Sequence, residues 1–276
     1  LINIEPDDKI KAYIRTNDLK DVDYVNSMSV VMITKNGTVK KTSLEAYSRP
    51  RTNGINAIEI RDNDQLLGAK LTNGDSQIMI ATKNGKCIRF EEEKVREVGR
   101  GSIGVRGITL EDNDEVIGMI VVNDVQNETV LVVSERGYGK RTAVEDYRIA
   151  NRGGKGVITL NITEKTGNLI AIQTVTDEDG LMIINKSGVA IRMGMDSMRV
   201  MGRNTQGVKV INLKNNDEIA AIAKVEMDKE VEEEETEGEE GAENLPGAVN
   251  SDVIEFKDSP QTGDNSVSNT GDAEYL

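Results

Sequence analysis

The chain has 276 residues, of which 34 are basic and 48 acidic, and it contains no histidine, no tryptophan and one cysteine, Cys87. These absences exclude a Ser-His-Asp triad, a Cys-His dyad, histidine-ligated zinc and an intrachain disulfide. No apolar run of about 18 residues and no signal peptide are visible, so no membrane partner is expected, and a lone cysteine suits a reducing cytoplasm.

The charge is divided unevenly along the chain. From Glu226 to Leu276, 17 acidic residues stand against two lysines, so this segment carries −15 while residues 1–225 carry +1. The block at 231–237 repels itself and the residues after it are polar, so we expect residues 226–276 to form a disordered acidic tail. Two interpretations remain open for it: a solubilising tail, or an internal competitor for a cationic surface on the body.

Taken in chain order, residues 2–10 copy the end of a repeat, as at 59–66. This predicts that the chain opens inside a partial blade, with further blades upstream. Short runs rich in Val, Ile and Met then follow at 29–34, 77–82 and 129–133, each bounded by turn residues, and these predict strands. No helical stripe of three or more turns is present.

Self-similarity indicates the architecture. A turn glycine follows each strand and recurs roughly every 50 residues, as expected for repeats, at Gly37, Gly85, Gly137 and Gly188. A Gly-apolar pair follows each turn, at 54–55, 104–105, 156–157 and 207–208. Such turns supply the positive φ angles of a two-residue hairpin. Each repeat of roughly 50 residues is therefore expected to contain about four strands. We therefore expect an all-β, propeller-like domain over residues 1–225, with four blades.

Cations recur at one phase of every repeat. Four residues after each turn glycine stand Lys41, Arg89, Arg141 and Arg192, and the loop before each Gly-apolar pair contains Arg51, Arg100, Arg152 and Arg203. Lys40, Lys86, Lys140 and Lys155 add to these two sets. Equivalent positions of radially arranged blades share a rim, so the pattern predicts a cationic belt with few aromatics, which suits a DNA duplex better than single strands. The alternative is that these are edge-strand charges that prevent aggregation.

The glycine-rich segments carry weaker signals. The spacing at 99–104 matches a dinucleotide-binding motif but leads into a strand-like run, so it is interpreted as a coincidence. Arg152-Gly153-Gly154-Lys155 lacks the remainder of a nucleotide-binding loop. We expect either a loop whose backbone amides and two cations grip DNA phosphates, or a tight connector between strands.

Three segments together carry a family resemblance. Residues 36–42, 137–144 and 202–208 resemble the C-terminal domain of DNA gyrase A, and the likeness runs over essentially all of residues 1–225. The resemblance implies a six-bladed β-pinwheel whose blades exchange strands and wrap DNA, with this chain matching blades three to six. The family's signature box lies in its first blade, and residues 152–156 resemble a degenerate copy of its core.

The resemblance also implies partners and cofactors. It implies an A2B2 assembly with the rest of the gyrase A polypeptide and the ATPase polypeptide, gyrase B, of a bacterial type IIA topoisomerase. ATP, Mg²⁺ and the catalytic tyrosine belong to other parts of that assembly, so this segment is expected to be non-catalytic and to need no cofactor of its own. The sequence thus predicts a DNA-wrapping module. The alternatives are the equivalent domain of topoisomerase IV and a protein-binding propeller without a DNA role.

Overall fold

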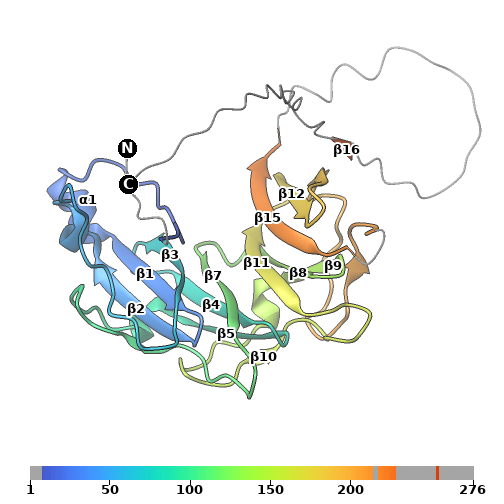
Figure 1. The fold of residues 1–276 in the computed structure, drawn as a ribbon, viewed down its shortest axis with the longest axis horizontal. Coiled ribbons are helices and arrows are strands. Elements are labelled where there is room, and N and C mark those ends of the chain that lie inside the picture. Colours follow the sequence, from blue (N-terminus) through green and yellow to red (C-terminus); the bar gives the residue numbers. More distant parts are fainter. Residues whose placement is uncertain (1–7, 214–216, 228–252, 255–276) are drawn as a thin grey trace, which may run out of the picture.

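Four antiparallel sheets follow one another along an arc (Figure 1). The structure is a computed structural model, and it describes residues 8–213, 217–227 and 253–254. Each sheet has four strands, so the expected all-β blades are confirmed. The strands are β1 (Ser29–Thr34), β2 (Thr38–Ser43), β3 (Leu66–Thr72), β4 (Gln77–Thr82), β5 (Lys86–Glu91), β6 (Val105–Arg106), β7 (Val116–Val122), β8 (Thr129–Ser134), β9 (Tyr138–Ala143), β10 (Val157–Ile158), β11 (Leu169–Val175), β12 (Asp179–Asn185), β13 (Ala190–Gly194), β14 (Val208–Lys209), β15 (Ile219–Glu226) and β16 (Val253–Ile254).

Every blade is built around one hairpin and completed from elsewhere in the chain. The orders are β3-β1-β2-β6, β10-β5-β4-β7, β11-β8-β9-β14 and β15-β12-β13-β16. In the first three blades the outermost strand (β6, β10 or β14) belongs to the following repeat. The register repeats as well, since Val105 lies opposite Val39, Val157 opposite Cys87 and Val208 opposite Gly139. Consecutive blades are therefore joined by hydrogen-bonded strand exchange.

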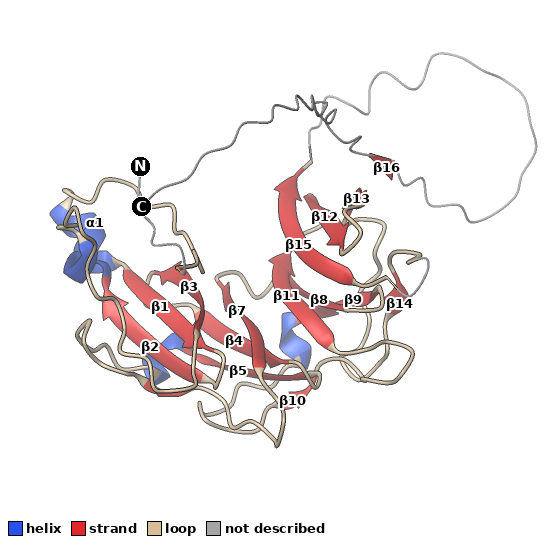
Figure 2. Cartoon of the chain, viewed as in Figure 1, coloured by secondary structure: helices blue, strands red, loops and turns tan. Residues whose placement is uncertain are grey.

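The opposite edge of each blade faces the centre of the arc. The innermost strands β3, β7, β11 and β15 contact one another in succession, and Figure 2 shows them along the concave side. Backbone hydrogen bonds reinforce this succession, because the amides of Val116, Leu169 and Ile219 donate to carbonyls in the preceding hairpin turns. The exchanged strands therefore lie along the convex outer edge.

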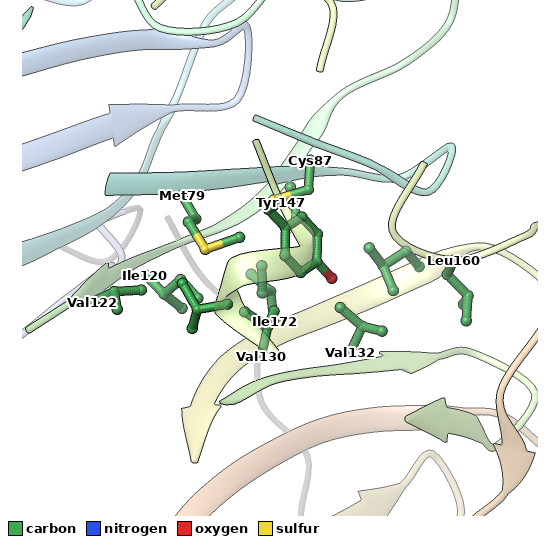
Figure 3. Packing of buried hydrophobic residues seen from close by; sticks show 12 residues of the cluster. Met79, Cys87, Ile120, Val122, Val130, Val132, Tyr147, Leu160 and Ile172 are labelled. Carbon is green, nitrogen blue, oxygen red and sulfur yellow. The ribbon is translucent and has the colours of Figure 1, made fainter. Parts of the chain in front are cut away.

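The hydrophobic core consists of layers between blades. Between the second and third blades, Met79 and Cys87 pack against Val130, Val132 and Tyr147, together with Ile120, Val122, Leu160 and Ile172 (Figure 3). Equivalent layers lie between the first and second blades and between the third and fourth. Both faces are covered in the second and third blades, and in the first blade the outer face is covered by a cluster around Val25, Val30, Met32 and Leu44. For this reason β1, β4 and β8 are buried almost throughout instead of alternating between buried and exposed residues. Cys87 is fully buried in this layer.

Three short 3₁₀ helices and one α-helix interrupt the strands. The 3₁₀ helices η1 (Leu44–Tyr47), η2 (Glu92–Lys94) and η3 (Val144–Asp146) follow β2, β5 and β9. Helix α1 (Val22–Ser27) was not predicted from the sequence, and its first turn is capped by the Asp21 carboxylate, which accepts from the amides of Asp23 and Tyr24. Such a six-residue helix depends on this cap and on its contacts with η1 more than on a long apolar stripe.

The two ends of the chain are described only in part. Residues 1–7 lie outside the described residues, and 8–20 form no helix or strand, so the predicted partial blade has no strand in the described part. In the tail, Val253–Ile254 form β16 and pair with Ala190 and Ile191 of β13, which departs from the expectation of disorder throughout. The rest of the tail beyond Met227 lies outside the described residues, and the expected boundary at 225/226 falls at the end of β15.

The crossing from each repeat into the preceding blade requires glycine, and this generates a prediction. Gly156 has φ +75°, and a Cβ there would lie 2.7 Å from the Cys87 carbonyl oxygen. The equivalent Gly54 has φ +74° but open space around it. Gly54→Ala should therefore cost only the dihedral strain, about 1 kcal/mol of unfolding free energy, whereas Gly156→Ala should cost clearly more. Urea unfolding measures both, and equal losses would contradict the tight crossing.

Candidate nucleic-acid interface

The outer edge of the arc is formed by segments that we call the outer straps, residues 95–106, 147–158 and 198–209. Each strap leaves a repeat just after β5, β9 or β13 and runs along the outside of the preceding blade. Its amides hold it there, since Val98 N donates to Lys41 O at 2.9 Å, and Ala150 and Met201 donate to Arg89 O and Arg141 O at 2.8 Å. The strap then ends in β6, β10 or β14.

The structure contradicts the expected belt at its two central positions. The Arg89 and Arg141 side chains are buried, with Arg141 only 3% exposed. Arg89 Nη1 donates to the carbonyls of Val144 and Tyr147 in the next repeat, each at 2.8 Å. Burial of this guanidinium lowers the pKa of Arg89 from its ordinary value. These arginines fasten one repeat to the next and cannot line a rim.

Arg141 repeats this arrangement one blade further along. Its Nη1 donates to Met195 O at 2.7 Å, and its Nη2 lies 2.6 Å from an Asp177 carboxylate oxygen. Lys41 is mostly buried too, with its Nζ 3.4 Å from Glu92, a carboxylate with no exposed side-chain surface. Arg192 is exposed in the terminal blade, where its guanidinium donates to Glu226 O. Of the four residues in the first predicted set of belt cations, Lys41, Arg89 and Arg141 therefore point between blades.

Lys40 and Lys140 also differ from the prediction. Both are almost completely buried, and their ammonium groups donate to backbone oxygens of the following repeat. Burial, followed by repulsion from Arg203, lowers the pKa of Lys140 to about 8, and burial and Arg100 lower the pKa of Lys40. Neither ammonium can reach a phosphate, because the loop that it holds covers it.

The loop arginines lie at the surface, as predicted, but they have structural contacts as well. Arg152 Nε donates to Lys94 O at 2.8 Å and its Nη1 to Arg106 O at 3.2 Å. Arg203 makes the equivalent pair of bonds to Asp146 O and Ile158 O. Arg100 and these two side chains are half-exposed, whereas Arg51 is exposed. They remain available to an anion at the outer edge.

The Gly153-Gly154 loop does not offer all the amides that were expected for phosphate. Gly153 N already donates to Gly107 O at 2.7 Å, and the Gly153 and Gly154 carbonyls accept from Thr109. The connector interpretation therefore holds for this part of the backbone. Lys155 is exposed, while Lys86 is half-exposed and forms an ion pair with Glu111.

Sequence reasoning missed a third set of cations, Arg96, Arg148 and Arg199. All three are exposed, and each directly follows a buried residue of its strap, namely Val95, Tyr147 or Met198. They recur seven residues after Arg89, Arg141 and Arg192. The signal that could have revealed them is this buried-then-exposed alternation, which is typical of a segment with one covered face.

The straps concentrate positive charge on a nearly neutral body. Residues 95–106 contain three arginines and one glutamate, while 147–158 and 198–209 each contain three cations and no carboxylate. Such a row supplies a field that attracts polyanions and is screened by salt. In the described part of the chain no cluster of potential metal ligands was found, and no helix there is long and apolar enough to cross a membrane.

The exchanged strands and the cationic straps define a class of protein, the strand-exchanged β-propeller with a basic outer edge. The chain belongs to the family described as "DNA gyrase C-terminal domain, beta-propeller", whose matches at residues 29–73, 76–123, 128–176 and 181–226 coincide with the four repeats.

The relatives agree with this assignment. The chain is 40% identical over 278 aligned residues to the A subunit of DNA gyrase from Staphylococcus aureus strain NCTC 8325 / PS 47, and the alignment covers 95% of the chain but 31% of that protein. The corresponding protein of strain MRSA252 is 42% identical over 254 residues, which covers 91% of the chain and 28% of that protein. The chain thus spans about a third of the length of these relatives.

Solved structures show the same fold. A DNA gyrase A C-terminal domain superimposes with a TM-score of 0.70 at 24% identity, covering 81% of this chain and 72% of that one. The C-terminal domain of a DNA topoisomerase IV superimposes with a TM-score of 0.68 at 25% identity, covering 72% of this chain and 62% of that one.

The buried Lys140 ammonium generates a pH prediction. Its pKa of about 8 lies below that of an unfolded lysine, so between about pH 8 and 10.5 the unfolded chain binds more protons and this group's contribution to stability rises with pH. The unfolding free energy of the wild type minus that of Lys140→Met should therefore increase from pH 7.5 to 9.5. Paired urea titrations measure this difference, and a flat or falling difference would contradict a depressed pKa.

Proposed function

We propose that this chain binds double-stranded DNA along its outer straps and bends the duplex around the convex edge. The single observation that carries this proposal is the row of nine strap cations opposed by one carboxylate over three successive blades, in which two sets recur in phase, Arg96, Arg148 and Arg199 and then Arg100, Arg152 and Arg203. Phosphates recur regularly along a duplex, so a regular row of cations matches them without reading sequence.

The composition of the straps favours duplex over single-stranded DNA. Single strands are held chiefly by aromatic side chains on which bases stack. The one aromatic residue in the three straps is Tyr147, which is buried and shares a hydrogen bond with Thr159. A surface of cations without exposed aromatic rings suits a backbone that presents phosphates outward.

Curvature is the mechanical part of the proposal. Duplex DNA has a persistence length of about 150 bp, so bending a site of 20–30 bp costs roughly 1–6 kcal/mol. Phosphate neutralisation along the straps and release of counterions offset this cost. The blades hold the straps in a fixed arc, so no reorganisation of the protein is required when the DNA bends.

Within a larger protein, the bent DNA would serve strand passage. The chain would act as the wrapping module of a DNA gyrase A polypeptide, in an A2B2 assembly with the ATPase polypeptide, gyrase B, in the cytoplasm. It would direct a neighbouring DNA segment to a cleavage gate and so favour negative supercoiling, while ATP, Mg²⁺ and the catalytic tyrosine act elsewhere. The 40% identity to a gyrase polypeptide supports this over topoisomerase IV, whereas the two structural neighbours superimpose almost equally well.

The first test neutralises the third set of cations. The triple variant Arg96→Gln, Arg148→Gln and Arg199→Gln should weaken binding to a 40-bp duplex and reduce the slope of log K against log salt by up to about 2.7, since each phosphate contact contributes about 0.9. Fluorescence anisotropy at several salt concentrations measures both quantities.

A matched control removes the same charge elsewhere. Lys35, Lys83 and Lys186 also recur in phase, but they lie at the hairpin turns and form ion pairs with Glu115 and Glu218. Their replacement by glutamine should leave the salt slope nearly unchanged. Equal effects of the two triple variants would contradict the strap proposal, because DNA affinity would then depend on net charge and not on the position of the cations. Negligible duplex affinity of the wild type at low salt would favour the protein-binding propeller instead.

We also propose that the acidic tail competes with DNA for the straps. Replacing the four glutamates at 232–235 by glutamine removes charge but retains the residues of β16. If the tail competes electrostatically, this variant should bind the duplex more tightly at low salt, and the gain should shrink as salt rises. Titration of wild type and variant side by side measures this, and identical binding curves would leave the tail as a solubilising segment.

A further inference from the structure

Two surface loops of the outer straps each have a lysine ammonium beneath them, that of Lys40 or that of Lys140. Lys140 Nζ donates to the carbonyls of Gly202, Arg203 and Thr205 and to the Thr205 hydroxyl. The Gly202 and Thr205 carbonyls lie 2.9 and 3.3 Å from Nζ. The side chain comes from β9 of one repeat, and all four acceptors belong to the strap of the next.

The chemistry of this site is that of a cation held by backbone oxygens. An unpaired buried carbonyl is costly, and several carbonyls that converge on one point need a donor with several N–H groups in different directions. A lysine ammonium meets that need, because its three N–H groups are shared among the four oxygens. The nearby charged groups are Arg203, which opposes the ammonium, and Asp146, which favours it. The ammonium therefore holds the loop at 202–205 from beneath, together with Asn161 N, which donates to Thr205 O at 3.0 Å, and the Thr205 hydroxyl, which donates to Gly202 O at 3.1 Å.

The same device is present at the first junction of the arc, two before that of Lys140, and absent from the middle one. Lys40 Nζ donates to Ala57 O at 2.7 Å and to the carbonyl of Arg100, which occupies the place of Arg203. At the middle junction the equivalent residue is Ile88, and a Cβ added to Gly154 would lie 3.4 Å from its Cδ1. There the loop packs on an apolar side chain and is pinned by Thr109 instead.

We infer that Lys40 and Lys140 are positioning residues for DNA binding: each locks the strap loop above it so that Arg100 or Arg203 presents its guanidinium to a phosphate. The inference rests on the proposed function. Lys140 holds the backbone carbonyl of Arg203, while the guanidinium of Arg203 is anchored by Asp146 O at 3.1 Å and Ile158 O at 2.9 Å. The arginine is therefore fixed at both ends, and a pre-positioned contact loses less entropy on binding.

A double-mutant cycle separates positioning from direct contact. Lys140→Met removes the donors and retains an unbranched chain, and Arg203→Gln removes the guanidinium. Each single variant should weaken duplex binding by about five- to tenfold, as expected for one charge-assisted contact, and the double variant should be no weaker than Arg203→Gln alone. Independent effects that multiply would overturn the inference, because they would make Lys140 a separate contributor.

A second measurement does not depend on DNA. Amide hydrogen exchange on the full chain should accelerate roughly tenfold or more at residues 202–207 in Lys140→Met, with little change at 151–156. Ile88→Met, which alters the apolar junction without removing a donor, is the matched control and should leave 202–207 unchanged. Unaltered exchange at 202–207 in Lys140→Met would overturn the inference that Lys140 holds this loop in place.

The two measurements also separate this inference from the proposed function. If Arg203→Gln leaves duplex affinity unchanged while Lys140→Met still accelerates exchange in the loop, then Lys140 holds the loop but the loop does not contact DNA. If Lys140→Met does not fold, the equivalent cycle of Lys40→Met and Arg100→Gln applies, with exchange followed at 99–104. Multiplying effects in that cycle, or unaltered exchange there, would overturn the inference in the same way.

Discussion

The rest of the structure depends on the backbone pairing between each blade and the strap of the next repeat. This pairing fills the outer edge of each of the first three blades, which would otherwise expose a row of unpaired amides and carbonyls. It also sets the place of every other feature. The core layers lie between blades because the straps hold the blades together, and the cations of the outer edge are spaced by the blades that carry them.

The sequence predicted the repeat architecture correctly but not which cations lie at the surface. The repeat period, the hairpin turns and the Gly-apolar crossings were all visible, because each depends on local backbone geometry that leaves its mark on residue type. The recurrence of cations at one position of each repeat was visible too, but its interpretation as a surface belt was wrong for Arg89 and Arg141. Their partners are carbonyls of Val144 and Tyr147 or of Met195 and Met198, and a carbonyl leaves no mark in the sequence.

The positive charges of the repeats serve two tasks. Five of the cations on β2, β5 and β9 point between blades and satisfy backbone oxygens or carboxylates, namely Lys40, Lys41, Arg89, Lys140 and Arg141. On the straps, Arg96, Arg148 and Arg199 each follow a buried residue and are exposed, whereas Arg100, Arg152 and Arg203 are half-exposed. Recurrence of a cation at one position of each repeat therefore does not by itself distinguish a side chain that links two blades from one that binds a ligand. The decisive property is whether the opposite face of the segment is covered, and in an interior blade both faces are.

The uniform register of strand exchange bears on how such a domain changes in size. Val105, Val157 and Val208 enter their host blades at matching positions, and the glycine before each of them meets an equivalent carbonyl. The backbones of the donor and acceptor strands are thus equivalent among repeats. Recombination that adds or deletes one whole repeat would therefore preserve the backbone pairing of every interior blade, so the length of the arc can change in steps of one repeat.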